Sequence, residues 1–337
     1  MPRGIIAPRF QYWDRQDASI IAEFDHIHLK DDTRFPFVLQ CERIKIIEEA
    51  LAMAKANPLV TVRMSSTFTG FEQNQDSVTV HFTNEDGEAE TIVASHLVSS
   101  EGARSIARKL LELDFQGFTY PERTLNIEVA YDFTKRGFTE RNYISDPVEY
   151  SNLFHWKGPP DRWRIHFPTD PNEEEKKLTN PEALQERLKR FIQIDSDFEI
   201  CGFNLYPVHQ RVAEKFRVGR VMLAGDSAHV NSPIGGMGLN SGVHDAFNLA
   251  DKLSRVWRNE ASDAELDRYD RQRRQIAIQH TQAQTIRNKR LLAERDPAVR
   301  KHNHEELRRT AEDPVLARKF LRRASLLDSL KEAEQIE

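Results

Sequence analysis

The sequence predicts an α/β protein with a ligand-binding parallel sheet and a second, smaller domain built mainly from an antiparallel sheet. Three observations lead to this prediction. The 337 residues suffice for two domains and a sizeable core. A short hydrophobic run near residue 221 leads into a glycine-rich loop and then an amphipathic helix. Residues 115–207 carry aromatic-rich, strand-like runs with a single helical pattern.

Composition excludes several classes of protein. Hydrophobic residues make up 39% and charged residues 30%, which is typical of a globular chain. A net charge of −5 gives no general attraction to nucleic acid, and acidic residues interleave with the basic ones near the C-terminus. Cys41 and Cys201 cannot form a disulfide framework, and no apolar run is long enough to span a membrane. The start of the sequence lacks a signal or transit pattern, so we expect a cytoplasmic protein.

The first hundred residues predict one helix followed by a β-meander. Apolar residues at Ile44, Ile47, Leu51 and Ala54 have helical spacing and indicate a helix over 43–55. Strand-like runs follow at 59–64, 70–73, 77–83 and 91–99, with a turn at 84–87.

The middle of the chain predicts a sheet that carries many large aromatic side chains. A helix is expected over 181–193. Alternation along strands decides which side chains face inward, so all the large aromatic candidates stay open at this point. These candidates are Tyr143, Phe154, Trp156, Trp163, His166 and Phe167.

The strongest chemical signal lies in residues 219–253. Asp226 directly follows a hydrophobic strand, and the carboxyl end of such a strand is where open α/β sheets bind ligands. The loop after it contains Pro233 and three glycines, Gly235, Gly236 and Gly238, which let backbone N–H groups approach a flat ligand. A helix over about 239–258 then directs its positive end at that ligand.

The C-terminal region predicts helices. Residues 262–265 have the spacing of a capping box, and further helical patterns follow Pro297 and Pro314. No set of His, Cys, Asp and Glu has metal-ligand spacing, so no metal site is expected. No Gly-x-Ser-x-Gly elbow supports a hydrolase.

The block G-R-V-x-L-A-G-D-x-A-H, followed by P-x-G-G-x-G-x-N and D-A-x-N-L-x-x-K-L, resembles the second flavin-binding motif of the single-component FAD-dependent aromatic hydroxylases. Residues 97–108 resemble the family's second fingerprint, with matches at Gly102, Arg104, Ser105 and Arg108. Glu101 stands where the family has Asp, near the FAD pyrophosphate. His229 is implied to be a structural neighbour of the loop.

The resemblance implies a set of site residues. The implied FAD-binding residues are Gln40, Val62, Glu101, Gly102, Arg104, Gly225, Asp226, Pro233, Gly235, Gly236, Gly238, Leu239 and Asn240. Two residues are implied to be catalytic: Pro233, against the flavin ring near its oxygen-reacting face, and Arg211, close to the flavin and the active-site cleft. Three of these residues have plain structural alternatives, since Gln40 can be a helix cap, Val62 a buried strand residue and Arg211 a surface arginine.

The family pattern opens with a G-x-G-x-x-G unit, which this sequence lacks. We therefore expect residues 1–108 to hold the remainder of the first FAD-binding segment with part of the substrate-domain sheet. The substrate domain is then 109–207, the second FAD-binding segment 208–260 and the C-terminal helices 261–337.

The resemblance implies an FAD-dependent monooxygenase that uses NADPH or NADH and O₂ to hydroxylate a small aromatic, phenolic substrate through a flavin C4a-hydroperoxide. A homodimer is consistent with the class. The main alternative is a truncated, non-catalytic remnant that cannot retain FAD. A halogenase or dehydrogenase is a third reading, although the halogenase segment W-x-W-x-I-P does not occur.

Overall fold

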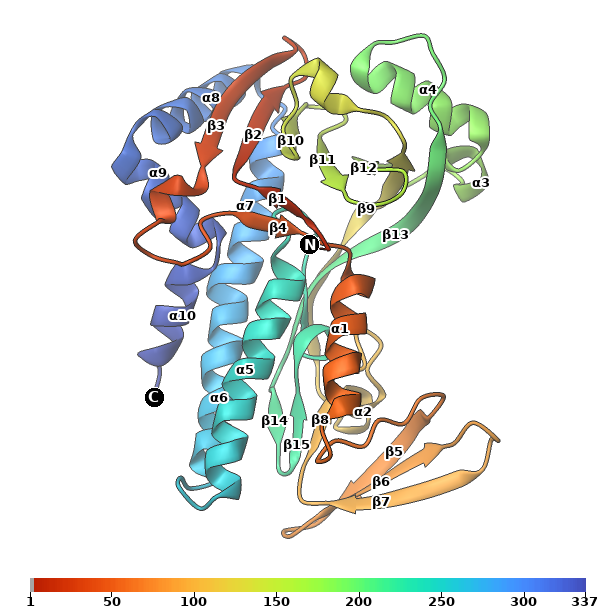
Figure 1. Cartoon of the computed structure of the whole chain (residues 1–337), viewed down its shortest axis with the longest axis vertical. Helices are drawn as coiled ribbons and strands as arrows, with labels where there is room; N and C mark the ends of the chain where they lie inside the picture. Colours follow the sequence, from red (N-terminus) through yellow and green to blue (C-terminus); the bar gives the residue numbers. More distant parts are fainter. Residues whose placement is uncertain (1–2) are drawn as a thin grey trace. The chain divides into compact units, whose positions relative to one another are not determined.

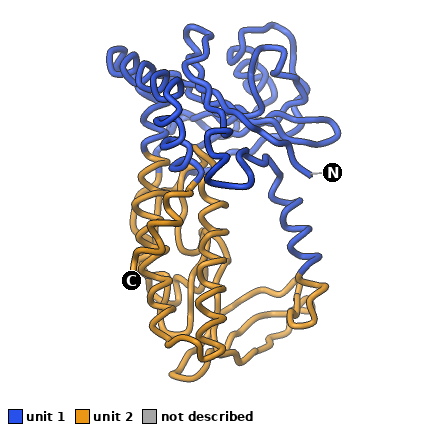
Figure 2. The backbone as a smooth tube through the Cα atoms, turned by 60° about the vertical axis from the view of Figure 1, so that its left-hand side comes forward, with its two compact units in different colours: residues 1–53, 120–208, 287–325 blue, residues 54–119, 209–286, 326–337 orange. Residues whose placement is uncertain are grey.

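The computed structural model describes residues 3–337 and divides the chain into two compact units, each assembled from three stretches of chain (Figures 1 and 2). Unit 1 contains the chain up to residue 53 together with residues 120–208 and 287–325. Unit 2 contains residues 54–119, 209–286 and 326–337. Strands β9 and β13 and helices α1 and α7 have residues in both units.

Unit 1 is built on a large sheet with the strand order β13-β9-β12-β11-β10-β2-β3. Neighbouring strands pair antiparallel from β9 to β10 and between β2 and β3, and β10 pairs parallel with β2. The strands of unit 1 are β1 (Ile5–Ala7), β2 (Arg9–Asp14), β3 (Ser19–Asp25), β4 (Val38–Gln40), β9 (Phe115–Val129), β10 (Arg141–Ser145), β11 (Ser151–Trp156), β12 (Arg162–Pro168) and β13 (Ile200–Ala213), of which β1 and β4 pair only with each other. Its helices are η1 (His26–Leu29), α1 (Arg43–Ala56), η2 (Phe133–Arg136), α3 (Glu175–Leu178), α4 (Pro181–Ile192), α7 (Ala283–Leu292), α8 (Pro297–Glu312) and α9 (Pro314–Ala324).

The core of unit 1 lies between one face of this sheet and helix α4. Strand residues such as Ile127, Leu153 and Ile165 are fully buried against Leu188 and Phe191 of α4. Helix α4 begins where the sequence predicts, because Asn180 caps it and Pro181 fits its first turn.

Unit 2 contains a three-stranded sheet, β14-β15-β8, in which β15 and β8 run parallel, and a separate meander, β5-β6-β7. Its strands are β5 (Thr67–Gln73), β6 (Val78–Thr83), β7 (Ala89–Ala94), β8 (Leu97–Ser99), β14 (Arg217–Val218), β15 (Val221–Leu223) and β16 (His229–Val230). Its helices are α2 (Ile106–Leu110), η3 (Gly225–Ser227), α5 (Met237–Trp257), α6 (Ala264–Ile276), the π-helical stretch η4 (Ala277–Gln282) and α10 (Leu327–Glu334). The fully buried strand β15 packs on Leu249 of α5 and on Leu266 and Tyr269 of α6, which lies beside α5 (Figure 1).

The predicted fold class is confirmed: a parallel strand pair precedes the glycine loop, a mainly antiparallel sheet is inserted, and helices end the chain. The helices expected at 43–55, 181–193 and 239–258 are present as α1, α4 and α5. The turn expected at 84–87 forms, with the Gly87 N–H donating to Asn84 O at 3.1 Å.

Two local predictions are wrong. Residues 59–64 form no strand, because the chain turns at Asn57–Val60 and leaves Leu59 92% exposed. The capping box at 262–265 does not form. Helix α6 begins at Ala264 with Asp263, not Ser262, as its N-cap, and the Glu265 carboxylate that the box requires pairs with Arg255 of α5 instead.

No helix among residues 3–337 is both long enough and apolar enough to cross a membrane.

Candidate functional site

The loop after β8 is held by the Glu101 carboxylate. Its Oε1 accepts from the hydroxyls of Ser99 (2.7 Å) and Ser105 (3.0 Å) and from the Ala107 N–H (3.1 Å), and its Oε2 accepts from the Ile106 N–H (3.0 Å). Burial raises the pKa of this carboxyl, but these hydrogen bonds outweigh burial and hold the pKa below its ordinary value. Glu101 therefore satisfies the start of helix α2, and it shapes the loop that presents Gly102.

The turn after β15 presents Asp226 to solvent. Gly225 has φ +61°, a conformation that favours glycine, and the turn Gly225–Ser227 exposes Asp226 beside the buried Ser227. Ser227 fixes the far side of the turn: its Oγ accepts from the Gly102 N–H (3.1 Å) and its carbonyl accepts from Arg108 (2.8 Å). The two sequence fingerprints, 97–108 and 219–229, thus meet through Ser227.

The glycine loop leads directly into helix α5. The Gly236 N–H donates to Pro233 O at 3.0 Å, and Gly235 and Gly236 both have positive φ. Gly236 is the N-cap and provides no side-chain hydrogen bond to the helix start. A Cβ on Gly238 would lie 3.3 Å from Asn231 Oδ1, a buried oxygen that has no hydrogen-bond partner among the described residues.

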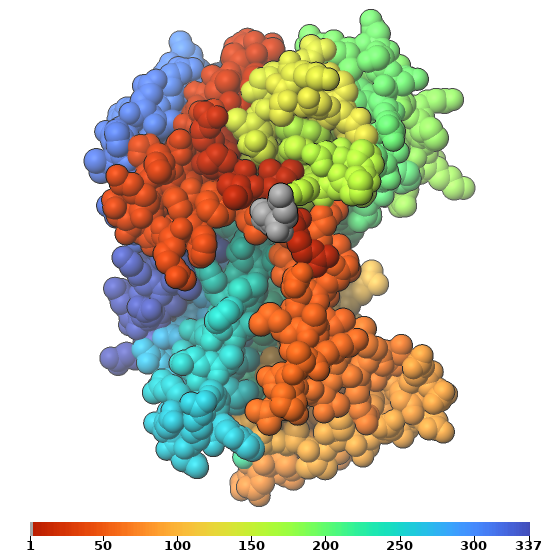
Figure 3. Space-filling view, viewed as in Figure 1, coloured from red at the N-terminus to blue at the C-terminus, as the bar shows by residue number. Residues whose placement is uncertain are grey.

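Leu239 and Asn240 are exposed at the first turn of α5, and part of the surface of this helix is visible in turquoise in Figure 3. The N-terminus of a helix attracts partial negative charge because its first backbone N–H groups lack intrahelical acceptors. The loop and the helix end therefore suit a flat ligand that carries an electron-rich edge.

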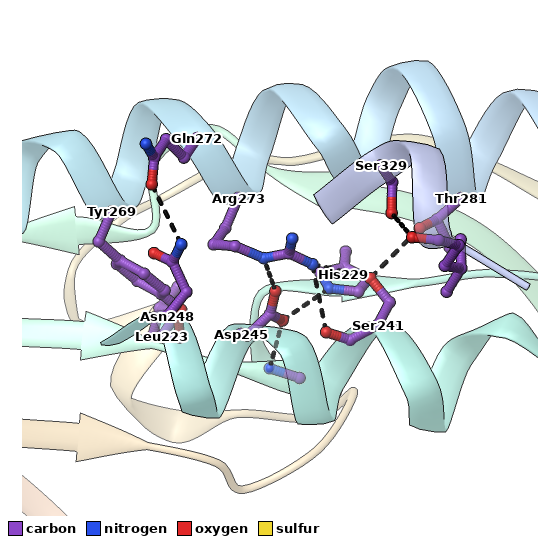
Figure 4. A network of polar contacts seen from close by, with 12 residues as sticks. Leu223, His229, Ser241, Asp245, Asn248, Tyr269, Gln272, Arg273, Thr281 and Ser329 are labelled. Atoms are coloured by element: carbon purple, nitrogen blue, oxygen red, sulfur yellow. Dashed lines mark hydrogen bonds and ion pairs between the residues drawn. The ribbon is translucent and has the colours of Figure 1, made fainter. Parts of the chain in front are cut away.

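A buried polar cluster around Asp245 is hydrogen-bonded to the Gly225 turn, and Figure 4 shows its members His229, Asp245 and Arg273. Asp245, which is 0% exposed, accepts from the Gly225 N–H (3.0 Å), from His229 Nε2 (2.8 Å) and from Arg273 Nε (2.6 Å). Arg273 Nη2 also reaches the carbonyl and the hydroxyl of Ser241, both at 3.3 Å. His229 is only 1% exposed, which agrees with the structural position expected of it.

Three other predicted site residues differ from one another in their surroundings. The Arg211 guanidinium donates to Phe115 O (3.0 Å) and to Thr119 Oγ1 (3.3 Å) of β9. Arg104 is exposed. Val62 does not lie on a strand as expected, but in the irregular segment before β5.

Gln40 belongs to unit 1 and does not begin a helix as predicted. It is the last residue of β4, and its Nε2 donates to the carbonyls of Glu140 (2.8 Å) and His155 (2.9 Å). The helix starts only at Arg43.

Alternation along the strands of unit 1 separates the six aromatic and histidine candidates. Trp163 and Phe167 point into the core under α4. Tyr143, Phe154, Trp156 and His166 lie on the opposite face. Cross-strand pairing forms a row across this face, Tyr12–Tyr143–Asn152–His166–Asn126.

This second face of the sheet is rich in unsatisfied polar atoms. Among residues 3–337, the buried polar atoms without a hydrogen-bond partner include Asn126 Oδ1, Asn152 Oδ1, Trp156 Nε1 and His166 Nδ1. Burial lowers the pKa of His166 to about 3, so its ring is neutral at pH 7. Because buried polar groups normally have partners, this face is suited to an aromatic ligand with polar substituents.

A buried cluster of Ser145, His304 and Asp14 in unit 1 resembles a hydrolytic triad in its contacts only. Ser145 Oγ lies 3.1 Å from His304 Nε2, and His304 Nδ1 lies 3.4 Å from Asp14 Oδ2. Ser145 is 2% exposed and Arg300 pairs with Asp14. The cluster therefore joins α8 to the sheet. Among the described residues, no group of three or more His, Cys, Asp and Glu could hold a metal ion.

The parallel strand pair, the exposed aspartate and the glycine loop at a helix N-terminus define a protein of the dinucleotide-binding class. Comparison with known proteins identifies the family. Residues 16–284 match the family model described as an FAD binding domain. The chain therefore belongs to this family, that of the FAD-dependent aromatic hydroxylases.

Individual relatives agree. Para-nitrophenol 4-monooxygenase of Pseudomonas sp. (strain WBC-3) is 31% identical over 95% of this chain and 79% of that protein. The 3-(3-hydroxy-phenyl)propionate/3-hydroxycinnamic acid hydroxylase of Escherichia coli (strain SMS-3-5 / SECEC) is 33% identical over 79% of this chain, which spans only 43% of that relative. The crystal structure of p-nitrophenol 4-monooxygenase PnpA from Pseudomonas putida DLL-E4 superposes with a TM-score of 0.89 at 30% identity, over 97% of this chain and 82% of that one.

Two observations show that the residues present fit FAD. The Asp226 carboxylate is exposed on a turn that buried residues hold in place, and the N-terminus of α5 has no side-chain cap.

The sequence analysis did not assign a role to Ser227, Asp245 or Arg273. Asp245 could have been found, since it is a charged residue spaced four from Ser241 and Leu249 on the buried side of α5.

Proposed function

We propose that this chain is an FAD-dependent monooxygenase that hydroxylates a small phenolic compound with NADPH or NADH and O₂. When bound, FAD would supply the redox chemistry, in which one oxygen atom enters the ring and the other leaves as water while the nicotinamide is oxidised. The observation that carries the proposal is Asp226, exposed on a turn whose two sides are anchored by Asp245 and by Gly102 and Arg108.

The chain's own residues would have separate tasks. Asp226 would accept a hydroxyl of the cofactor's ribitol, and the N-terminus of α5, where Leu239 and Asn240 lie, would stabilise negative charge on the reduced flavin by about 0.3–2 kcal/mol. Glu101 and Gly102 would shape the loop facing the pyrophosphate. Pro233 and Arg211 are proposed near the reacting face, as the family resemblance implies.

The polar face of the unit 1 sheet would recognise the substrate. His166 would accept a phenolic hydroxyl at Nδ1, and Phe154 and Tyr143 would contact the ring. Para-nitrophenol and hydroxyphenylpropionate are the first compounds to test, because relatives are named for acting on them or on close analogues.

The test begins with FAD retention. The purified chain is incubated with FAD, desalted and examined by visible absorption, and retained flavin is the expected result. Asp226→Ala should raise the Kd for FAD by about tenfold or more, since a hydrogen bond to a charged group contributes about 1.5–3 kcal/mol. Asp251→Ala, which removes another exposed carboxylate of unit 2, is the matched control. A colourless wild-type chain would contradict the proposal.

Activity is tested next by oxygen uptake with NADH or NADPH, with and without each phenol. Stimulation of oxygen uptake together with formation of a hydroxylated product is expected. Flavin retention without any product from a panel of phenols would contradict the substrate class.

A further inference from the structure

Asp245 connects the two parts of unit 2 that the proposed FAD site uses. Its Oδ2 accepts the Gly225 N–H, which belongs to the turn that presents Asp226. Its Oδ1 accepts from Arg273, whose guanidinium also bonds Ser241 near the start of α5. The Asp245 carboxylate therefore bonds the Asp226 turn directly and is linked, through Arg273, to Ser241 in the N-terminal part of α5 (Figure 4).

The two elements also approach very closely at this point. A Cβ added to Gly242 of α5 would lie 3.2 Å from the Cα of Gly225. Backbone therefore meets backbone, and the Gly225 N–H reaches Asp245 one helical turn further along. The arrangement leaves little freedom for the turn to shift along the helix.

Stability does not explain why charged groups occupy this position. Removing charges from water costs several kcal/mol for each ion, and well-packed apolar residues of similar volume often serve stability as well or better. Burial raises the pKa of the Asp245 carboxyl, but His229 and Arg273 outweigh burial and hold the pKa below its ordinary value. The carboxylate stays ionised, so both oxygens remain acceptors with fixed directions.

We propose that the buried His229–Asp245–Arg273 cluster is a positioning device for FAD, which holds Asp226 at a set distance from the N-terminus of α5. The cluster does not touch the cofactor. It acts through Gly225 and Ser241, which it bonds directly. The inference rests on the proposed function, because it assigns the cluster to the same FAD site.

The central experiment compares FAD affinity in Asp245→Asn, Asp226→Ala and the double variant, at a temperature where far-UV circular dichroism shows each chain folded. Asparagine keeps the size of the side chain but turns an NH₂ group toward donors. Asp245→Asn should raise the Kd for FAD about tenfold and change the visible circular dichroism of the bound flavin. The double variant should bind as Asp226→Ala does, within about threefold, because Asp245 acts through Asp226.

A second pair of variants keeps the test decisive if Asp245→Asn does not fold. His229→Gln retains an N–H donor near the position of Nε2 and should bind FAD within about threefold of wild type. His229→Leu removes the donor and should weaken binding about tenfold. Hydrogen exchange without FAD supplies a reading independent of the cofactor: peptides covering 224–229 should exchange faster in Asp245→Asn and His229→Leu than in wild type.

Each contrary result has a distinct meaning. If wild type binds FAD but Asp245→Asn and His229→Leu bind it equally well, the inference is overturned while the proposed function stands. The inference is also overturned if the Kd for FAD of the double variant rises by the product of the two single-variant factors, because Asp245 would then act independently of Asp226. If wild type does not retain FAD at all, the proposed function fails and the inference fails with it.

Discussion

Replacing His166 with phenylalanine should make the free energy of unfolding fall less as the pH is lowered. The His166 ring lies on the polar face of the unit 1 sheet with its Nδ1 buried, and burial, with a smaller contribution from Arg164, lowers its pKa from 6.5 to about 3. Between those two pH values the unfolded chain binds a proton that the folded chain does not. The free energy of unfolding therefore falls as the pH falls below 6.5, and the loss is complete near pH 3.

The magnitude follows from the two pKa values. The full difference corresponds to about 5 kcal/mol below pH 3, and at pH 5 about 2 kcal/mol of stability is already lost relative to pH 7.5. Phenylalanine does not titrate and has a similar ring, so its variant lacks this contribution whatever its stability at neutral pH.

Urea unfolding at pH 7.5 and pH 5 measures the effect. The fall in unfolding free energy between the two pH values should be about 2 kcal/mol smaller in His166→Phe than in wild type. His302→Gln changes a side chain that is 68% exposed and is the control. Equal falls in wild type and His166→Phe would refute the reasoning, since the ring would then titrate alike in the folded and unfolded chains.

Three further predictions concern other parts of the chain. Gly238→Val should weaken FAD binding more than it lowers Tm, because its Cβ would press on Asn231 Oδ1 at the helix start; equal losses would indicate a purely structural loop. Trp163→Ala should cost about 3–5 kcal/mol in urea unfolding, whereas Phe203→Ala, at an exposed position, should cost less than about 0.5 kcal/mol. Glu101→Gln should flatten the loss of stability in acid, because the carboxyl has a lowered pKa when folded and its contribution disappears as the pH falls through that value; an unchanged acid limb of Tm against pH would contradict this.

The elements that the sequence predicts well are those with a local physical cause. Helix α4 has a cap, a proline in its first turn and a regular apolar face, and it is found within one residue of its predicted end. The position of Asp226 at the end of a strand is predictable because a glycine and an aspartate follow a hydrophobic run, and the structure gives Gly225 the positive φ that favours glycine. Residues 59–64 have the composition of a strand but no partner strand, and pairing is a property of the whole sheet that no local run encodes.

The candidate site shows the same division. Motif residues such as Asp226 and Gly236 are recognised by their spacing, whereas Ser227 gains its importance from Gly102 and Arg108, more than a hundred residues away. The capping box failed for a similar reason, because Arg255 of helix α5 holds the Glu265 carboxylate that the box requires. Long-range contacts of this kind decide the roles of polar side chains, and linear spacing does not contain them.

The alternation of side chains along the strands of unit 1 places the polar residues on one face of the sheet, which is the candidate substrate surface. Adjacent strands lie about 4.8 Å apart, so Asn152 and Asn126, two strands apart on either side of His166, are separated by about 10 Å. A phenol with a polar group opposite its hydroxyl has its polar ends within that span. The sheet buries Trp163 and Ile165 beneath the same strands, so shifting β12 by one residue would exchange the polar row for core residues. The register that stabilises the core of unit 1 is thus the same register that gathers the unsatisfied polar atoms on its other face.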